Sequence, residues 1–367
     1  MIIDKISQIE LELTTKCNAK CPQCVRNYYG SYTWPTLPLV DMELEWFKTA
    51  IPLDTWMLLE HIKLCGTYGD PMMHPQLLDI IQWIKTVSSA DITINTNGGI
   101  RSASWWKQLA EILNPSKDKV FFGIDGLADT NHLHRIGVDF NKVIANLTSF
   151  NQAGGTSIWS FLIFEHNQHQ VELARELAIS LKCSNFVCKS TSRFVDKLHN
   201  LVDQSPVVDQ QGIPIYFLQP TTEPKYKNQG YDEVRNIELT SGYANYLATA
   251  DISCISKLQK YIYISAEGDV FPCGWLADRM YGFESENHQD HKTLMDLIES
   301  VGGRNKINLH YSSLQDIVSG RWFEAIENTW KTNKIQRCAH MCGNRSTLIK
   351  HANKELSQTW SGVVNLK

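Results

Sequence analysis

The segment Cys17-Asn-Ala-Lys-Cys21-Pro-Gln-Cys24 places three cysteines on one short stretch with the spacing C-x3-C-x2-C. Apolar and polar side chains alternate before it, from Ile9 to Thr14, which is typical of a strand that ends just before the cysteines. Three thiolates on one tight loop can bind three corners of a cubane [4Fe–4S] cluster and leave one iron open. A zinc ion is the alternative, because a distant fourth ligand could complete a closed zinc site. The segment therefore indicates a metal site at the end of the first strand.

The composition is that of a globular protein, with 43% hydrophobic and 20% charged residues in a chain of 367. The net charge of -4 provides no basic field for nucleic acid or an anionic membrane. No uncharged apolar run approaches the roughly 18 residues of a membrane-spanning helix, and residues 1–5 do not resemble a signal peptide. We therefore expect a cytoplasmic protein without nucleic-acid or membrane partners, in which clustered cysteines bind metal rather than form disulfides.

Strand-like and helix-like stretches alternate through the first half of the chain. Strands are predicted at 9–14, 61–65, 91–95, 119–124, 157–164 and 185–190, and helices at 75–86, 104–113, 141–153 and 169–182. Repeated strand–helix units of this kind predict a parallel sheet or barrel with helices outside. The pattern provides six units and ends near residue 195.

The second half is organised differently. Residues 196–250 contain four prolines and are interpreted as a connecting or substrate-facing region. A hairpin is predicted at 261–272, with its turn near Glu267 and Gly268, and an amphipathic helix at 314–330.

Further motifs follow the later predicted strands: Leu64-Cys-Gly66-Thr-Tyr-Gly69-Asp70-Pro71, Thr96-Asn97-Gly98, and Gly123-Ile-Asp125-Gly126 with His134-Arg135. Together with the cysteine triad, they resemble the radical S-adenosylmethionine (SAM) superfamily. Taken alone, each also fits an ordinary turn or a surface charge. The resemblance implies a first cluster held by Cys17, Cys21 and Cys24, with SAM bound at its open iron.

The resemblance also implies which residues contact SAM. Glycines such as Gly66 and Gly69 let the backbone approach a ligand, and Asp70 offers a carboxylate to the amino group. Thr96 and Asn97 would lie near the ribose and methionine. Asp125 belongs to the motif after the fourth strand, and Arg135 would pair with the methionine carboxylate. The sequence departs from the usual pattern at Gln23, Asp70 and Gly123, where aromatic, Glu and Ser residues are commoner.

A second cysteine set lies in the last third of the chain. It comprises Cys254, Cys273 within Gly268-Asp-Val-Phe-Pro-Cys273, and the pair Cys338-Ala-His-Met-Cys342. This pattern resembles the twitch domain, a short relative of the SPASM auxiliary-cluster domain, and implies one further [4Fe–4S] cluster. A four-cysteine zinc site is the alternative, and His340 could replace one thiolate. A cluster with four cysteine ligands would transfer electrons rather than bind substrate.

We therefore predict an α/β fold: a partial (β/α)6 TIM-like barrel with a small C-terminal α+β auxiliary-cluster domain. The predicted boundaries are 1–195 for the barrel, 196–250 for the connecting region, 251–345 for the twitch-like domain and 346–367 for a tail. Cys65, Cys183 and Cys188 fall outside both sets and fit buried core positions. Because Phe186, Cys188 and Ser190 alternate, Cys188 is also interpreted as facing the barrel interior, where its thiol could donate a hydrogen atom.

The implied activity is reductive cleavage of SAM to a 5′-deoxyadenosyl radical, which abstracts a hydrogen atom from a substrate. We favour modification of a peptide or protein side chain, although the short segment before Cys17 leaves no room for a separate peptide-recognition domain. Dehydrogenation or epimerisation of a small molecule, such as a sugar or aminocyclitol, is the alternative. A flavodoxin or ferredoxin is the expected electron donor. The alternative from another class is a non-catalytic protein with two zinc sites.

Overall fold

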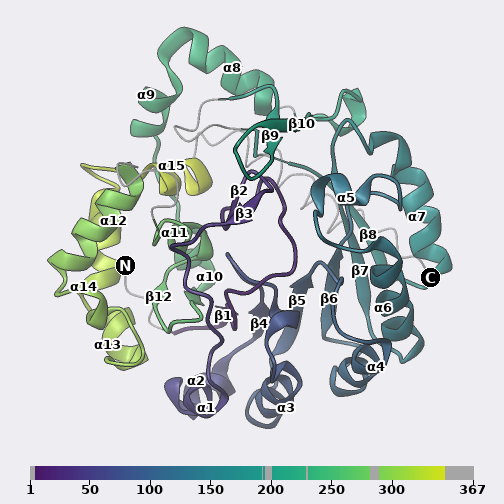
Figure 1. Cartoon of the computed structure of the whole chain (residues 1–367). Helices are drawn as coiled ribbons and strands as arrows, with labels where there is room; N and C mark the ends of the chain where they lie inside the picture. Colours follow the sequence, from purple (N-terminus) through teal and green to yellow (C-terminus); the bar gives the residue numbers. More distant parts are fainter. Residues whose placement is uncertain (1–4, 192, 195–200, 229, 282–288, 344–367) are drawn as a thin grey trace. The chain divides into compact units, whose positions relative to one another are not determined.

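The computed structural model describes residues 5–191, 193–194, 201–228, 230–281 and 289–343. Its main sheet has the strand order β12-β11-β1-β4-β5-β6-β7-β8 (Figure 1). The strands are β1 (Gln8–Leu11), β4 (His61–Leu64), β5 (Asp91–Thr96), β6 (Lys119–Gly123), β7 (Ser157–Ile163), β8 (Asn185–Ser190), β11 (Tyr261–Ile264) and β12 (Val270–Phe271). Strand β1 pairs in parallel with β4 and β11, strands β6 to β8 pair in parallel, and β12 is antiparallel to β11. The predicted α/β class with a mainly parallel sheet is confirmed.

The described chain divides into two compact units, and β5 begins in the first and ends in the second. The first unit comprises the residues up to Lys16, Pro35–Thr93 and those from Asn245 onward, and the second comprises Cys17–Trp34 and Ile94–Ala244. Helices of the first unit are α1 (Leu44–Ala50), α2 (Leu53–Leu58), η1 (Pro71–Met73), α3 (Leu77–Val87), α10 (Ile255–Gln259), α11 (Gly274–Ala277), α12 (Gln289–Ser300), η4 (Arg304–Lys306), α13 (Leu314–Ser319), α14 (Arg321–Thr329) and α15 (Gln336–Cys342). The second unit holds β2 (Asn27–Tyr28), β3 (Tyr32–Thr33), α4 (Ala103–Ile112), α5 (Asn131–His134), α6 (Phe140–Gln152), η2 (Gln168–Gln170), α7 (Val171–Ser180), β9 (Ser205–Val208), β10 (Pro214–Leu218), η3 (Pro224–Tyr226) and α8 (Gly230–Ser241). Helix α9 (Tyr243–Ala248) joins the two units along the chain.

Helix α3 shows how the sequence pattern produces the core of the first unit. Leu77, Ile80, Ile81 and Ile84 recur at helical spacing, and all four are fully buried. An aromatic cluster of Phe47, Trp56 and Trp83 packs together from α1, α2 and α3. Among the described residues, no helix is long and apolar enough to span a membrane.

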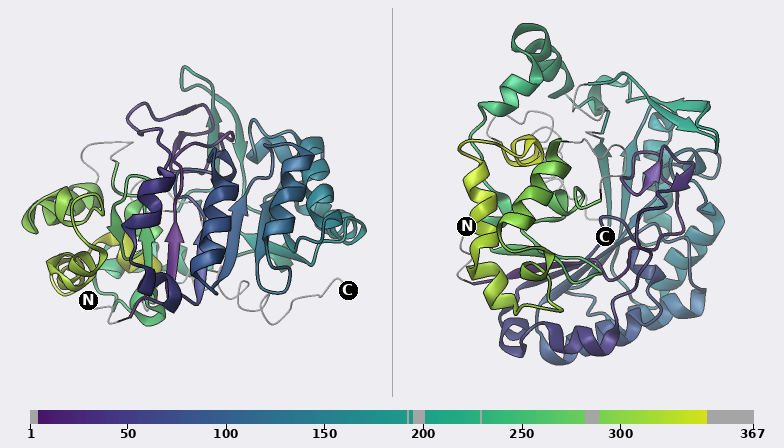
Figure 2. Two further views of the ribbon diagram at one scale, coloured as in Figure 1. Left: turned by 90° about the horizontal axis from the view of Figure 1, so that it is seen from below. Right: turned by 60° about the vertical axis from the view of Figure 1, so that its left-hand side comes forward.

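Helices α4, α6 and α7 lie along one face of β6, β7 and β8 in the second unit (Figure 2). Helices α4 and α6 begin where the side chains of Ser102 and Asp139 accept hydrogen bonds from free backbone N–H groups of the first turn. Strand β6 alternates buried and half-buried residues, and Phe122 on its helix-facing side is fully buried against α4 and α6.

The second half of the chain has three features that the sequence pattern did not predict. Strand β11 pairs in parallel with β1, so the predicted hairpin joins the main sheet and the first unit is assembled from distant segments. The region predicted as connecting contains the antiparallel β9–β10 hairpin and helix α8. The helix predicted at 314–330 is two helices, because the chain turns out of the helical conformation at Gly320.

Phe122 provides a test of the core of the second unit. Truncation in Phe122→Ala leaves a cavity among aromatic rings and is expected to lower the free energy of unfolding by about 3–5 kcal/mol. Phe217→Ala is the matched control, because Phe217 on β10 is 43% exposed and its loss should cost less than about 1 kcal/mol. Urea unfolding of both variants measures the difference, and equal losses would contradict this assignment of the core.

Candidate functional site

The cysteine triad lies on the loop at the start of the second unit. Cys21 is buried and its carbonyl oxygen accepts the backbone N–H of Cys24 at 3.1 Å, which closes a tight turn. Two side-chain N–H donors are directed at sulfur: Asn97 Nδ2 lies 3.8 Å from Cys17 Sγ, and Arg135 Nη1 lies 3.8 Å from Cys21 Sγ. Donors of this kind stabilise a thiolate, which is the form of cysteine that ligates metal.

The Thr96-Asn97-Gly98 motif holds the Asn97 side chain beside the triad loop. Asn97 Nδ2 donates to Asn18 Oδ1 at 2.8 Å, and Asn97 Oδ1 accepts from the backbone N–H of Gly99 at 2.8 Å. Thr96 Oγ1 accepts from the N–H of Gly98 at 3.0 Å. The motif therefore fixes the loop after β5 to the loop of the cysteines, and Gly98 supplies the positive φ of +70° that the turn requires.

Asp125 is fully buried and is surrounded by donors. Its carboxylate contacts Arg135 Nε at 2.6 Å and His134 Nδ1 at 2.7 Å, and accepts the backbone N–H of Leu162 at 2.7 Å. Burial acts to raise the pKa of Asp125, but the Arg135 charge and these hydrogen bonds outweigh it and lower that pKa to about 2. Asp125 therefore positions the Arg135 side chain, rather than being open to a ligand itself.

Gly123 makes room for the guanidinium of Arg135. A Cβ atom at position 123 would lie 2.5 Å from Arg135 Nη2, which is closer than two nonbonded atoms can approach. The departure from the usual Ser at this position thus has a physical reason: a side chain here would push Arg135 away from its present place beside Asp125 and Cys21.

The glycine-rich loop after β4 lies in the first unit. A Cβ atom on Gly69 would overlap the carbonyl oxygen of Thr14, and the N–H of Asp70 donates to the carbonyl of Lys16 at 2.9 Å. The Asp70 carboxylate accepts the N–H of Met72 at 3.0 Å and begins helix η1. The predicted SAM loop is therefore packed directly on the segment that precedes Cys17 in the sequence.

All four cysteines of the second set line one cavity in the first unit. The cavity encloses about 360 Å³ of empty space including its open mouth. Its other walls are mostly apolar. The described lining residues are Ile252, Cys254, Pro272, Cys273, Trp275, Leu276, Ile326, Trp330, Arg337, Cys338, Met341 and Cys342. His340, the predicted alternative ligand, is not among them. The structure thus brings together cysteines that are as much as 88 positions apart in the sequence, from Cys254 to Cys342.

The thiols in this cavity have pKa values that are shifted in different directions. A hydrogen bond with Cys342 lowers the pKa of Cys254, whereas burial raises the pKa of Cys273 to about 12. Burial also raises the pKa of Cys338. A cationic metal centre would reverse the cost of burying several thiolates together, so the donor set fits a metal or an iron–sulfur group.

Within the described part of the chain, no three His, Cys, Asp or Glu side chains converge into a metal-binding arrangement as they stand. The residue types, the shared cavity and the sulfur-directed donors nevertheless fit thiolate-ligated groups.

Comparison with known proteins identifies the domain that carries the triad. The model of the family described as the Radical SAM superfamily matches residues 11–178, which include the triad and the motifs after β4, β5 and β6. The chain contains a radical SAM domain. No curated protein sequence matches the chain significantly.

Two solved structures of anSMEcpe share the fold of this chain at low sequence identity. The structure of native anSMEcpe with bound AdoMet is 14% identical over 98% of both chains, with a TM-score of 0.54. A histidine-tagged form of anSMEcpe with bound AdoMet is 14% identical over 99% of this chain and 95% of that chain, with a TM-score of 0.55. SuiB of Streptococcus suis bound to S-adenosylmethionine is 15% identical over 91% of this chain and 77% of that chain, with a TM-score of 0.48.

The position of Cys188 in the radical SAM domain corrects one prediction. Phe122 faces helices α4 and α6, and it lies opposite Trp159, which in turn lies opposite Phe186 in the parallel register. Residues opposite each other in parallel strands share a face of the sheet, and so do residues two apart on one strand. Cys188, two residues after Phe186, therefore lies on the face that the helices cover. Arg175 of α7 also lies over the Phe186 ring, 5.9 Å from its centre. The prediction that Cys188 faces the barrel interior is wrong, and its thiol is not placed to donate hydrogen there.

Two residues near the predicted site were not singled out from the sequence. His134 is part of a quoted motif, but its hydrogen bond to Asp125 depends on the fold. Glu12 is a buried carboxylate that contacts the glycine-rich loop. Its sequence signal is weak: it is a charged residue between Leu11 and Leu13 in a predicted strand.

The buried ion pair allows a test by pH-dependent unfolding. Asp125→Asn leaves Arg135 without its counter-charge and is expected to destabilise the fold by about 3–5 kcal/mol at pH 7. Because folding depresses the pKa of Asp125 from 3.8 to about 2, its contribution is present above pH 3.8 and is lost as the pH falls towards 2. Urea midpoints measured from pH 3 to pH 7 should show this loss in the wild type and not in the variant.

The matched control is Asp203→Asn, which removes an exposed carboxylate that pairs with Arg235. Its effect should stay within about 0.5 kcal/mol at every pH. A similar effect of the two substitutions would contradict the role assigned to Asp125.

Proposed function

We propose that this protein is a radical SAM enzyme that cleaves SAM reductively and modifies a peptide or protein side chain by hydrogen abstraction. The observation that carries the proposal is the radical SAM domain at residues 11–178, whose cysteine triad has two side-chain N–H donors directed at its sulfurs. The anSMEcpe structures with bound AdoMet, which share its fold, support binding of SAM by this domain.

The residues of the site have separable tasks in this proposal. Cys17, Cys21 and Cys24 would hold a [4Fe–4S] cluster, which when bound supplies the electron that splits SAM into methionine and a 5′-deoxyadenosyl radical. Asn97 and Arg135 donate N–H groups to the ligand sulfurs, which favours thiolates. Asp125 keeps Arg135 in place, so that the rest of its guanidinium fork can bind the methionine carboxylate.

The second cysteine set would hold an auxiliary [4Fe–4S] cluster. Four thiols in one largely apolar cavity support this proposal, because a cubane has four irons to ligate. With every iron ligated by protein, the group would exchange electrons and would not bind substrate. Exclusion of water by the apolar walls would tune its potential. A four-cysteine zinc site is the competing occupant.

A peptide or protein side chain is the proposed substrate. The support is that anSMEcpe, which shares the fold with a TM-score of 0.52, was solved with bound AdoMet and the Cp18Cys peptide. The proposed electron donor is a flavodoxin or ferredoxin. Deuterium transfer from a labelled peptide into 5′-deoxyadenosine would support this substrate class, whereas transfer only from sugars or aminocyclitols would favour the small-molecule alternative.

Metal analysis of anaerobically prepared protein tests both cysteine sets. The wild type should contain about eight irons and eight sulfides per chain, since each cubane carries about four of each. The Cys17→Ala/Cys21→Ala/Cys24→Ala variant and the Cys254→Ala/Cys273→Ala variant should each retain about four irons. Cys183→Ala is the control and should retain all of them, because Cys183 belongs to neither set. About two zinc ions without iron would contradict both assignments.

Product analysis tests the catalytic assignment. With reductant, the wild type should release 5′-deoxyadenosine from SAM, and the triple variant of the triad should not. Arg135→Lys should raise the KM for SAM about tenfold with the iron content unchanged, because an ammonium cannot reproduce a guanidinium fork. Release of 5′-deoxyadenosine by the triple variant at the wild-type rate would overturn the proposal.

A further inference from the structure

Glu12 lies directly after β1 and is only 1% exposed. Its Oε1 atom accepts the backbone N–H groups of Tyr68 at 2.6 Å and Gly69 at 2.9 Å, and its Oε2 atom accepts the hydroxyl of Tyr263. All three donors are uncharged. Two of them belong to the glycine-rich loop, so the carboxylate acts on the backbone of that loop and not on a counter-charge.

The fit between Glu12 and the loop leaves no space for a larger residue. A Cβ atom on Gly66 would lie 2.7 Å from Glu12 Oε1 and would also overlap the carbonyl oxygen of Gly69. A Cβ atom on Gly69 would overlap Thr14. The two glycines are therefore required by close approach, and the carboxylate lies against the loop at its narrowest point.

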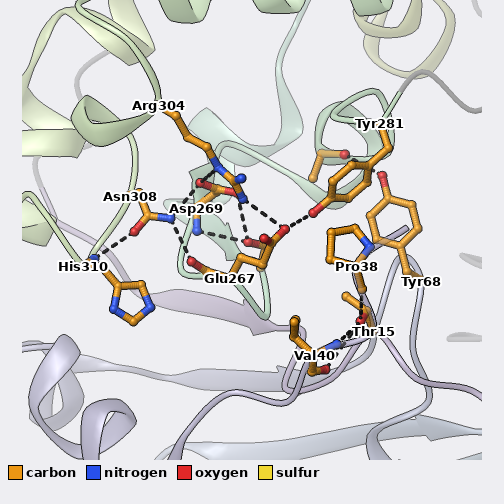
Figure 3. A network of polar contacts seen from close by, with 12 residues as sticks. Thr15, Pro38, Val40, Tyr68, Glu267, Asp269, Tyr281, Arg304, Asn308 and His310 are labelled. Atoms are coloured by element: carbon orange, nitrogen blue, oxygen red, sulfur yellow. Dashed lines mark hydrogen bonds and ion pairs between the residues drawn. The ribbon is translucent and has the colours of Figure 1, made fainter. Parts of the chain in front are cut away.

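The side chains of the loop are held by other segments of the first unit. The hydroxyl of Tyr68 donates to the carbonyl of Ala277 at 2.9 Å, and Thr67 Oγ1 donates to the carbonyl of Gly274 at 3.4 Å. Figure 3 shows the Tyr68 ring beside Tyr281, with ring centres 5.4 Å apart, and the Tyr281 hydroxyl directed at Glu267. Helix α11 and the β11–β12 turn thus hold the side chains, and Glu12 holds the backbone.

A buried carboxylate without a cation is costly, which argues for a specific purpose. Burial raises the pKa of Glu12 to about 7, although the hydrogen bonds from Tyr263, Tyr68 and Gly69 oppose the rise. A residue needed only for packing would avoid this cost. The cost is understandable if the two amides must be held in one orientation.

We propose that Glu12 is a positioning residue that fixes the Gly66–Asp70 loop in the conformation that receives the amino group of SAM. The role rests on the proposed function, since it requires that this loop contact SAM. Glu12 itself does not touch SAM in this proposal, because it is covered by the loop that it holds.

The test measures the loop and the ligand separately in the full, anaerobically reconstituted chain. Hydrogen exchange of the Tyr68 and Gly69 amides reports the anchoring of the loop without SAM, and equilibrium dialysis reports the affinity for SAM. Glu12→Ala should remove the protection of both amides and weaken SAM binding by about tenfold or more, since two buried donors lose their acceptor. Glu12→Gln should restore both, because an amide oxygen can accept the same N–H groups.

Glu10→Gln is the matched control. Glu10 lies on β1, two residues before Glu12, and its side chain pairs with Lys63 and Tyr261. This variant should keep wild-type exchange and affinity, and thermal unfolding confirms that each variant is folded.

Three outcomes would overturn the proposal or its basis. Protected amides in Glu12→Ala would show that Glu12 does not anchor the loop. Exposed amides with unchanged SAM affinity would show that the loop is not part of the SAM site. Failure of the wild type to bind SAM would overturn the proposed function, while the exchange data would still decide whether Glu12 holds the loop.

Discussion

The carboxylate of Asp125 is a charge with no access to water, and the second unit is arranged to stabilise it. Arg135 and His134 face its oxygens, while its backbone N–H and carbonyl bond to the side chains of Asn131 at 2.9 Å and Asn167 at 2.8 Å. One residue therefore fixes the segments after β6 and β7. Through Arg135 the same interaction reaches the sulfur of Cys21, so the geometry of the cysteine loop depends on a charge buried behind it.

Glu12 in the first unit meets the same physical problem with a different solution. Asp125 faces a guanidinium and has its pKa lowered to about 2, whereas the donors that Glu12 faces among the described residues are neutral and its pKa is raised to about 7. The contrast follows from the partners, because desolvation acts on both carboxylates in the same direction. Asp125 fixes the Arg135 side chain through a counter-charge, while Glu12 fixes the backbone of a loop through neutral amides.

The sequence predicts what depends on local pattern. Alternating strands and helix periodicity placed β4 to β8 correctly in the chain, because neighbouring residues determine these elements. Long-range pairing was not predictable in this way. The pairing of β11 with β1 joins residues about 250 positions apart, and the facing of Cys188 depends on the register across three strands. Alternation shows which residues share a face, but only the register shows which face the helices cover.

The four cysteines of the second set illustrate the same limit of local pattern. Their types suggested a ligand set, but only the folded chain brings Cys254 and Cys273 into one cavity with Cys338 and Cys342. The roles of Gly123 and Glu12 were also invisible, because both depend on a close approach between segments remote in sequence.

The central claim is that the triad holds the group to which SAM binds. The most direct measurement is the electron paramagnetic resonance spectrum of the reduced Cys254→Ala/Cys273→Ala variant, in which the triad would hold the remaining cluster. We expect a [4Fe–4S]+ signal that changes when SAM is added, because the amino and carboxylate groups of SAM would coordinate the open iron. A signal that SAM leaves unchanged, or no iron signal, would contradict the account.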